Sequence, residues 1–390
     1  MDDILSQGDD RDPSRWPRRL AVIGTPVLVA VASIVFLSLA HHPRSSAAVH
    51  PAPVTASTAP GPAGLAAHGL PWADSLQLPV AGTQPAWFSP ATGRSEPIGS
   101  LPAVSTGYQF TRVAGGWAVQ ANSAGKTACG GDCAAPPLPV WYLADGTRSV
   151  TRVGTANQVT PAATTGAVWL TSYPTTADTG TAAWTAREVS LAGAPLGPPV
   201  SLPLGYVIYR ATDRGLLLAP VSQQPGTTDY KLWNPADPQA SRTFDDVIAA
   251  SPAEIAWTPP CAATCQVRLL DLAAGRQTVV GLPAGSSATG GAFSPSGDFL
   301  ALQVSSGDAG ALAMRLEVAS VTSGRLTAMP GTSVSSDALV GFGWPTSGDS
   351  LVAEFSFATK VQLASWHPGA TRLAVAVIRP GQDQASLVVG

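Results

Sequence analysis

Two neighbouring stretches decide the fold: Val267-Arg-Leu-Leu-Asp-Leu-Ala-Ala-Gly-Arg276 and Ala292-Phe-Ser-Pro-Ser-Gly-Asp-Phe-Leu-Ala-Leu302. The first reads as a short apolar strand followed by a tight turn that contains Gly275 and Arg276. The second reads as a strand end, a turn built on Pro and Gly, and a new apolar strand. Each stretch therefore predicts an antiparallel hairpin.

The first of these units repeats along the chain. Tight turns that end similar strands stand near positions 93, 146, 193, 237, 275, 324 and 369, so successive spacings are 53, 47, 44, 38, 49 and 45 residues. From the second copy onward, another apolar strand precedes each unit. The fourth copy, at 230–237, lacks the glycine. The segments 107–112 and 205–210 also match each other, and we expect both to form innermost strands.

A period of about 45 residues with four short strands per unit is typical of a β-propeller. We therefore predict an all-β, seven-bladed propeller over residues 70–390, with six or eight blades as alternatives. Packing the sheets face to face in a ring buries the apolar faces that a single sheet leaves exposed. The last residues, 385–390, read as a short strand, and we expect them to pair with the blade that contains Trp87 and so close the ring.

The two stretches quoted above resemble blades of WD-repeat and TolB-type propellers. The Gly-His and Trp-Asp dipeptides of true WD repeats are missing, so the resemblance implies an architecture and no specific function. With 3 Lys against 19 Arg and abundant Ala and Gly, the composition is typical of a GC-rich genome and resembles actinobacterial proteins.

The N-terminal part predicts a membrane anchor. Residues 20–40 contain no charge and, at about 1.5 Å per residue, match the thickness of a bilayer as one transmembrane helix. Four arginines precede this run and Arg44 follows it, so we expect residues 1–19 to be a disordered cytoplasmic tail. Residues 41–69 read as a Pro/Ala-rich linker that carries the propeller outside the membrane. A cleaved signal peptide is the alternative.

Four cysteines form two Cys-x-x-x-Cys pairs, Cys129 with Cys133 and Cys261 with Cys265. Because an extracytoplasmic domain lies in an oxidising environment, we expect two local disulfides. Each pair falls between the second and third strands of a blade, in blades 2 and 5. The alternative is a zinc site with four thiolates, which is disfavoured because blades 2 and 5 lie nearly opposite each other on a ring of seven.

The sequence contains no motif that identifies a catalytic centre, and it predicts no cofactor and no metal. The net charge of −3 gives no basic surface for nucleic acid. We therefore expect a binding or scaffold module for an unknown protein, peptide or cell-envelope ligand, held to the lipid bilayer by residues 20–40. An envelope hydrolase or lyase with a site at the propeller channel is the alternative. The candidate contacts, on the face that carries the links between blades, are Tyr108, Asp132, Tyr206, Asp245 and Asp246.

Overall fold

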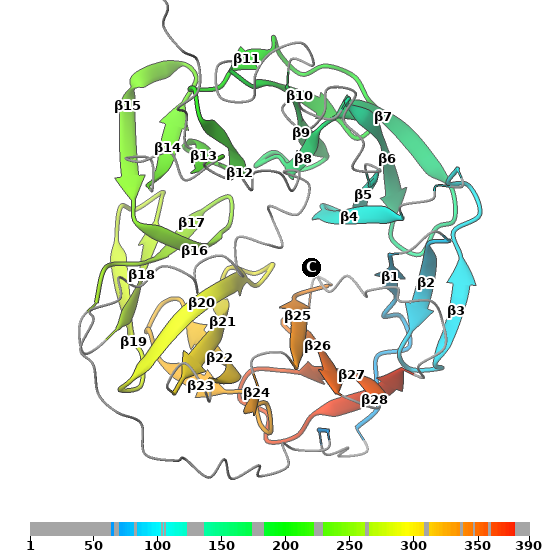
Figure 1. Cartoon of the computed structure of the whole chain (residues 1–390), viewed down its shortest axis with the longest axis vertical. Coiled ribbons are helices and arrows are strands. Elements are labelled where there is room, and N and C mark those ends of the chain that lie inside the picture. The colour runs from blue at the N-terminus through cyan, green and yellow to red at the C-terminus, as the bar shows by residue number, and fades with distance from the viewer. Residues whose placement is uncertain are drawn as a thin grey trace, which may run out of the picture.

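The computed structural model describes residues 64–65, 70–81, 84–102, 104, 107–122, 136–173, 183–221, 229–261, 265–307, 312–335, 338–345, 348–357 and 360–378. All regular elements in these ranges are β-strands. They form seven separate sheets arranged in a ring (Figure 1). The predicted all-β, seven-bladed β-propeller is confirmed.

The sheets are numbered as blades in chain order. Blade 1 contains β1 (Leu78–Val80), β2 (Ala86–Ser89) and β3 (Arg94–Pro97). Blade 2 contains β4 (Tyr108–Val113), β5 (Gly116–Ala121), β6 (Leu138–Ala144) and β7 (Val150–Ala156). Blade 3 contains β8 (Gln158–Pro161), β9 (Ala167–Ser172), β10 (Thr185–Ser190) and β11 (Val200–Ser201). Blade 4 contains β12 (Tyr206–Thr212), β13 (Gly215–Pro220), β14 (Tyr230–Asn234) and β15 (Asp237–Phe244). Blade 5 contains β16 (Asp246–Ala250), β17 (Glu254–Thr258), β18 (Gln266–Asp271) and β19 (Gln277–Gly281).

Blades 6 and 7 complete the ring. Blade 6 contains β20 (Ser286–Phe293), β21 (Phe299–Ser306), β22 (Ala313–Ser320), β23 (Leu326–Ala328) and β24 (Val334–Ser335). Blade 7 contains β25 (Leu339–Gly343), β26 (Leu351–Phe357), β27 (Lys360–Trp366) and β28 (Ala374–Ile378). All the pairings are antiparallel between strands that are close in sequence, which explains the short repeat in the chain.

The repeated turns connect the third and fourth strands of the blades, as the sequence predicts. Six of them contain a glycine with a positive φ angle, which other residues adopt only at a cost: Gly93, Gly146, Gly193, Gly275, Gly324 and Gly369. The fourth turn, between β14 and β15, contains no glycine. There the Asn234 side chain accepts a hydrogen bond from the backbone N–H of Ala236 at 3.0 Å, which forms an Asx turn instead.

Antiparallel strands give the ring two different faces. The links between blades and the connections from second to third strands leave at one end, which we call the loop face. The turns from first to second and from third to fourth strands leave at the other end, which we call the turn face. The two longest connections between the described strands, residues 122–137 and 173–184, both belong to the loop face.

Four innermost strands share an irregularity. In β12, β16, β20 and β25 the register against the second strand slips by one residue, so that Tyr209, Ile248, Thr289 and Val340 are each an extra residue. Such a β-bulge increases the local twist and turns two successive side chains toward the same side of the sheet. The strand β4 of blade 2 has no bulge.

Blade 7 packs against blade 1 and closes the ring. Leu78 and Phe88 of blade 1 share a buried cluster with Val352 and Leu363 of blade 7. Within the described residues, blade 1 has three strands, and the turn at Gly93 identifies them as its second, third and fourth. Residues 385–390, which we expect to complete this blade, lie outside the described part of the chain, so their pairing stays a prediction.

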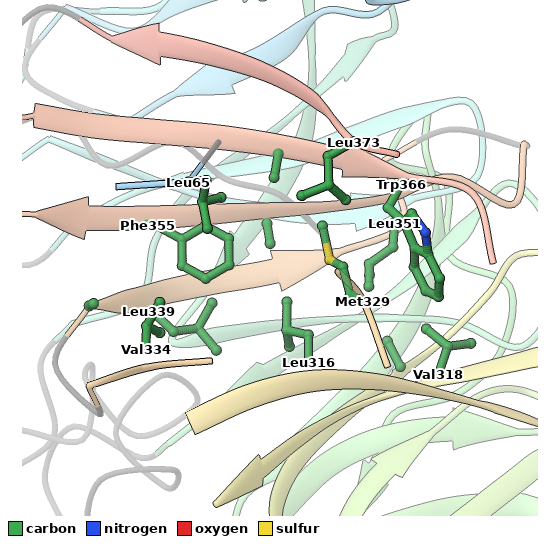
Figure 2. Packing of buried hydrophobic residues seen from close by; sticks show 14 of the residues in the cluster. Leu65, Leu316, Val318, Met329, Val334, Leu339, Leu351, Phe355, Trp366 and Leu373 are labelled. Carbon is green, nitrogen blue, oxygen red and sulfur yellow. The ribbon is translucent and has the colours of Figure 1, made fainter. Parts of the chain in front are cut away.

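A short segment before the first strand also belongs to the propeller. Leu65 is only 7% exposed and lies beside Phe355 in the cluster between blades 6 and 7 (Figure 2). Its backbone N–H donates to Gln362 Oε1 at 2.7 Å, and its carbonyl accepts from Gln362 Nε2 at 3.4 Å. The structure therefore places Gly64 and Leu65 on the propeller, although the sequence assigned them to the linker over residues 41–69. A single leucine in a stretch rich in Pro and Ala carries no periodic pattern that would have revealed this.

No helix among the described residues is long and apolar enough to cross a membrane. The predicted tail and transmembrane helix, residues 1–19 and 20–40, lie outside the described residues.

Candidate functional site between blades 4 and 5

The predicted contact residues that the structure describes all lie at the loop-face ends of innermost strands. Tyr108, Tyr206 and Asp246 are the first residues of β4, β12 and β16, and Asp245 is the link between blades 4 and 5. Asp132 lies outside the described residues. The antiparallel order of each blade produces this common placement, because every link between blades leads into the start of an innermost strand.

Tyr108 does not present a surface to a partner. Its side chain is 1% exposed and packs in the cluster between blades 1 and 2, edge-on to Trp141 with ring centroids 6.1 Å apart. Its hydroxyl donates a hydrogen bond to the carbonyl of Pro102. As a correction to the predicted set of contacts, Tyr108 therefore serves to pack the ring. Tyrosine is amphipathic, and the sequence does not show which end of it is covered.

Tyr209 and Tyr230 form an aromatic pair beside Asp245 and Asp246. Their ring centroids are 5.2 Å apart at an interplanar angle of 83°. Burial, with a smaller contribution from Asp246, raises the pKa of Tyr209 to about 12, although Arg210 opposes the shift. Burial, Tyr209 and Asp246 raise the pKa of Tyr230 as well. Both phenols therefore stay protonated at neutral pH and keep their hydrogen-bond donors.

Asp246 lies at the edge of this pair. Although the residue as a whole is exposed, its carboxyl group is partly desolvated, which is the main reason why its pKa is raised. A hydrogen bond from the Thr258 hydroxyl at 3.3 Å lowers the pKa, while the like charge of Asp245 raises it again. Asp245 and Asp246 thus place negative charge next to the pair of tyrosine rings.

Arg210 is the arginine next to this aromatic pair in the chain. It follows Tyr209 in β12 and stands opposite Leu217, which belongs to the cluster between blades 4 and 5. Its side chain is partly buried, and burial lowers its pKa, with Tyr209 acting in the opposite direction. A guanidinium ion nonetheless remains protonated in proteins.

Two further features lie at the loop face in this half of the ring. Leu204, in the link between blades 3 and 4 that leads into β12, is 57% exposed. A disulfide joins Cys261 and Cys265 in the connection that follows Thr258, as expected from the sequence. The second expected disulfide, between Cys129 and Cys133, lies outside the described residues.

The structure thus brings Asp245 and Asp246 together with four residues that the sequence did not single out: Tyr209, Arg210, Tyr230 and Thr258. We refer to these six residues as the blade 4/5 cluster. Tyr206 is not part of it, because its side chain packs against the buried residues between blades 3 and 4. The signal that could have pointed to Tyr209 is its place in the segment 205–210, which matches segment 107–112. The bulge at Tyr209 is the difference between them, and the sequence does not reveal it.

Other polar features lie elsewhere. Glu254 is a buried carboxyl at the turn face, next to Asp271 and Asp298. Within the described ranges, no group of three His, Cys, Asp or Glu side chains is placed to hold a metal ion. Two shallow hollows of about 340 and 370 Å³ lie at the turn face between blades 6 and 7 and on the outer side of blade 4, away from the blade 4/5 cluster.

Comparison with known proteins yields similar structures but no similar sequences. No family model and no curated protein matches the chain. TolB from Acinetobacter baumannii is 10% identical, with a TM-score of 0.43, over 82% of this chain and 67% of that one. The β-propeller domain of the Trilobed protease from Pyrococcus furiosus, described as having an open velcro topology, is 10% identical with a TM-score of 0.47, over 77% and 88%.

The structures of several peptidases are also similar to this chain. The acylaminoacyl peptidase of Pyrococcus horikoshii is 11% identical with a TM-score of 0.49 and matches 77% of this chain. The chain spans 50% of that peptidase and 41% of a prolyl endopeptidase to which it is also similar.

Proposed function

We propose that this propeller is a binding module whose loop face engages a protein, peptide or cell-envelope ligand through the blade 4/5 cluster. The observation that carries the proposal is the convergence of an aromatic pair, two carboxylates and an arginine at one face. The long connections of blades 2 and 3 leave from that same face. Loops on a rigid scaffold are the usual place for binding residues.

The composition of the cluster suits recognition. Tyr209 is partly exposed and offers rigid aromatic surface with a hydroxyl donor, which is the kind of side chain that dominates binding energy in interfaces. Tyr230 is buried and supports the Tyr209 ring edge-on. Leu204, in the link between blades 3 and 4, adds exposed apolar area to the same face of the ring. Asp245 and Asp246 supply charge at the rim, where it governs the rate and specificity of association more than affinity.

A pair of charge reversals tests the proposal. Asp245 and Asp213 are both exposed, but Asp245 lies at the loop face and Asp213 at the turn face of the same blade pair. We expect Asp245→Arg to change the amount of partner that is crosslinked to the full-length protein in intact cells by about fivefold or more, because reversing a charge at the rim of an interface alters the binding free energy by about 1 kcal/mol or more. Asp213→Arg should leave the yield unchanged.

Equal effects of Asp245→Arg and Asp213→Arg would count against the loop face. Hydrolysis of ester, peptide or glycoside substrates by the purified protein would instead support the alternative of an envelope enzyme.

The membrane attachment belongs to the same proposal and rests on the sequence of residues 20–40. Leu65 contacts Gln362 near the start of β27, so the chain joins the propeller close to the loop face. We expect the full-length protein to need detergent for extraction from membranes, whereas a chain that begins at residue 41 should be recovered without it. Full-length protein in the soluble fraction would contradict the tether.

A further inference from the structure

We infer that Arg210 binds a carboxylate group of the ligand, in a site on the innermost strand β12 at the side of blade 5. This inference rests on the proposed binding function and adds the chemical class of the group that is recognised. Figure 1 shows β12 and β16, the innermost strands of blades 4 and 5, bordering the centre of the ring.

The evidence begins with two arginines at matching positions in the sequence. Arg112 and Arg210 each stand five residues after a glycine, in Gly107-Tyr108 and Gly205-Tyr206 segments that form innermost strands. Arg112 is fully compensated: its two terminal nitrogens donate to Asp145 at 2.6 and 2.8 Å, and its guanidinium lies 5.0 Å from the centre of the Trp117 ring.

Arg210 lacks this compensation. Its Nε is buried and has no hydrogen-bond partner. None of the ion pairs between described residues includes Arg210. A buried donor without an acceptor is costly, and a charged one is more so, which makes the site favourable for an incoming anion.

The β-bulge explains why the two arginines differ. In blade 2, Arg112 stands opposite Trp117 without a slip in register and faces blade 1. In blade 4, the extra residue Tyr209 shifts the alternation of side chains between the two faces of the sheet. Arg210 therefore stands opposite Leu217 and faces blade 5. Bulges often re-aim a side chain next to a functional site, and here the bulge places Tyr209 and Arg210 on the same side.

The surroundings favour a carboxylate over a phosphate. A guanidinium fork matches either group. However, Asp246 is close enough to perturb Tyr209, the neighbour of Arg210, and Asp245 adds a second negative charge next to it. Repulsion from two carboxylates disfavours a dianion more than a monoanion. The protonated Tyr209 hydroxyl supplies an additional donor beside the cation.

The test uses sodium acetate as the probe on the full-length protein, at constant ionic strength, with sodium chloride and inorganic phosphate as comparison salts. Phenylglyoxal labels free arginines, and mass spectrometry locates the labelled residue. Acetate at ten times its dissociation constant should slow the labelling of Arg210 about tenfold, because about a tenth of the sites remain free. The labelling of Arg112 should not depend on acetate.

Matched substitutions keep the test independent of folding. Without probe, Arg210→Met should unfold at a higher temperature than the wild type, because an uncompensated charge is removed, whereas Arg112→Met should unfold at a lower one. The acetate-dependent rise in unfolding temperature should be lost in Arg210→Met and kept in Arg112→Met.

The inference is overturned if acetate leaves Arg210 labelling unchanged, if phosphate protects it better than acetate, or if Arg210→Met is destabilising. Any of these results together with a clear effect of Asp245→Arg on the crosslinked partner would reject the carboxylate site and leave the binding function standing. Loss of the Asp245→Arg effect would reject the binding function itself.

Discussion

Glu254 is buried at the turn face, with only 9% of its surface exposed. Burial is the main reason why its pKa rises to about 7; the charges of Asp271 and Asp298 act in the same direction, while a hydrogen bond with Ser251 opposes them. The folded protein therefore holds a proton on this carboxyl at pH values where the unfolded chain, with an ordinary pKa of 4.5, has lost it.

This difference makes stability depend on pH. A raised pKa in the folded state contributes stability that is complete below about pH 4.5 and is lost as the pH rises through about 7. We expect the loss to be at most about 3 kcal/mol. Glu254→Gln should remove the dependence in this window, as measured by urea unfolding between pH 4 and 8. An unchanged slope in the variant would show that other groups cause it.

At the level of single residues, the sequence predicts charge better than burial. The adjacent Asp245 and Asp246 are visible as a pair, and the structure places them at the loop face. Tyr209 and Tyr230 come together only because β12 and β14 belong to one sheet and both face blade 5. Nothing in their local sequence distinguishes them from Tyr108, which is buried elsewhere.

At the level of elements, the turn between third and fourth strands recurs with different surroundings. Gly93 and Gly324 have nearly the same positive φ, 67° and 69°. A side chain at Gly93 would meet open space, whereas a Cβ at Gly324 would lie 2.4 Å from the carbonyl oxygen of Val279 in the preceding blade. Gly324 thus lets the turn of blade 6 pack closely on the outer strand of blade 5.

The two glycines form a matched pair for substitution. Gly93→Ala should cost about 1 kcal/mol of stability, from the unfavourable φ alone. Gly324→Ala carries the same backbone penalty and in addition must displace Val279, so we expect a total of about 2–5 kcal/mol. Chemical denaturation of both variants measures the difference, and equal losses would mean that blades 5 and 6 do not approach each other as described.

The recurring turns show which features a sequence pattern can predict. A glycine, often followed closely by an arginine, marks the end of the third strand in most blades, and the spacing of these turns predicts the number of blades. The bulges at Tyr209, Ile248, Thr289 and Val340 have no common residue type, because an irregular register depends on how the two strands pair and not on one side chain.

At the level of the whole molecule, Leu65 holds the N-terminal segment to the last blade. Leu65→Ala should destabilise the propeller by about 2–5 kcal/mol, since it removes a buried side chain from the cluster between blades 6 and 7. The same change at Leu196, which is 54% exposed, should stay within about 0.5 kcal/mol. Thermal unfolding monitored by circular dichroism compares them, and similar values would place Leu65 outside the core.

The number of blades was predictable because short antiparallel units repeat their turn chemistry. The contact of Leu65 with Gln362 was not, because it joins residues 297 positions apart through one side-chain amide. Long-range contacts of this kind leave no periodic signal in a single sequence.

Photo-crosslinking from defined positions in intact cells tests most directly whether the loop face of the ring is the binding surface. A photoreactive residue is placed in turn at Leu204 and Asp245 of the loop face and at Asp213 and His367 of the turn face, all four of which are exposed. We expect adducts with one and the same partner from both loop-face positions and none from the turn-face positions. Adducts that arise equally from both faces, or only from the turn face, would contradict a binding site between blades 4 and 5.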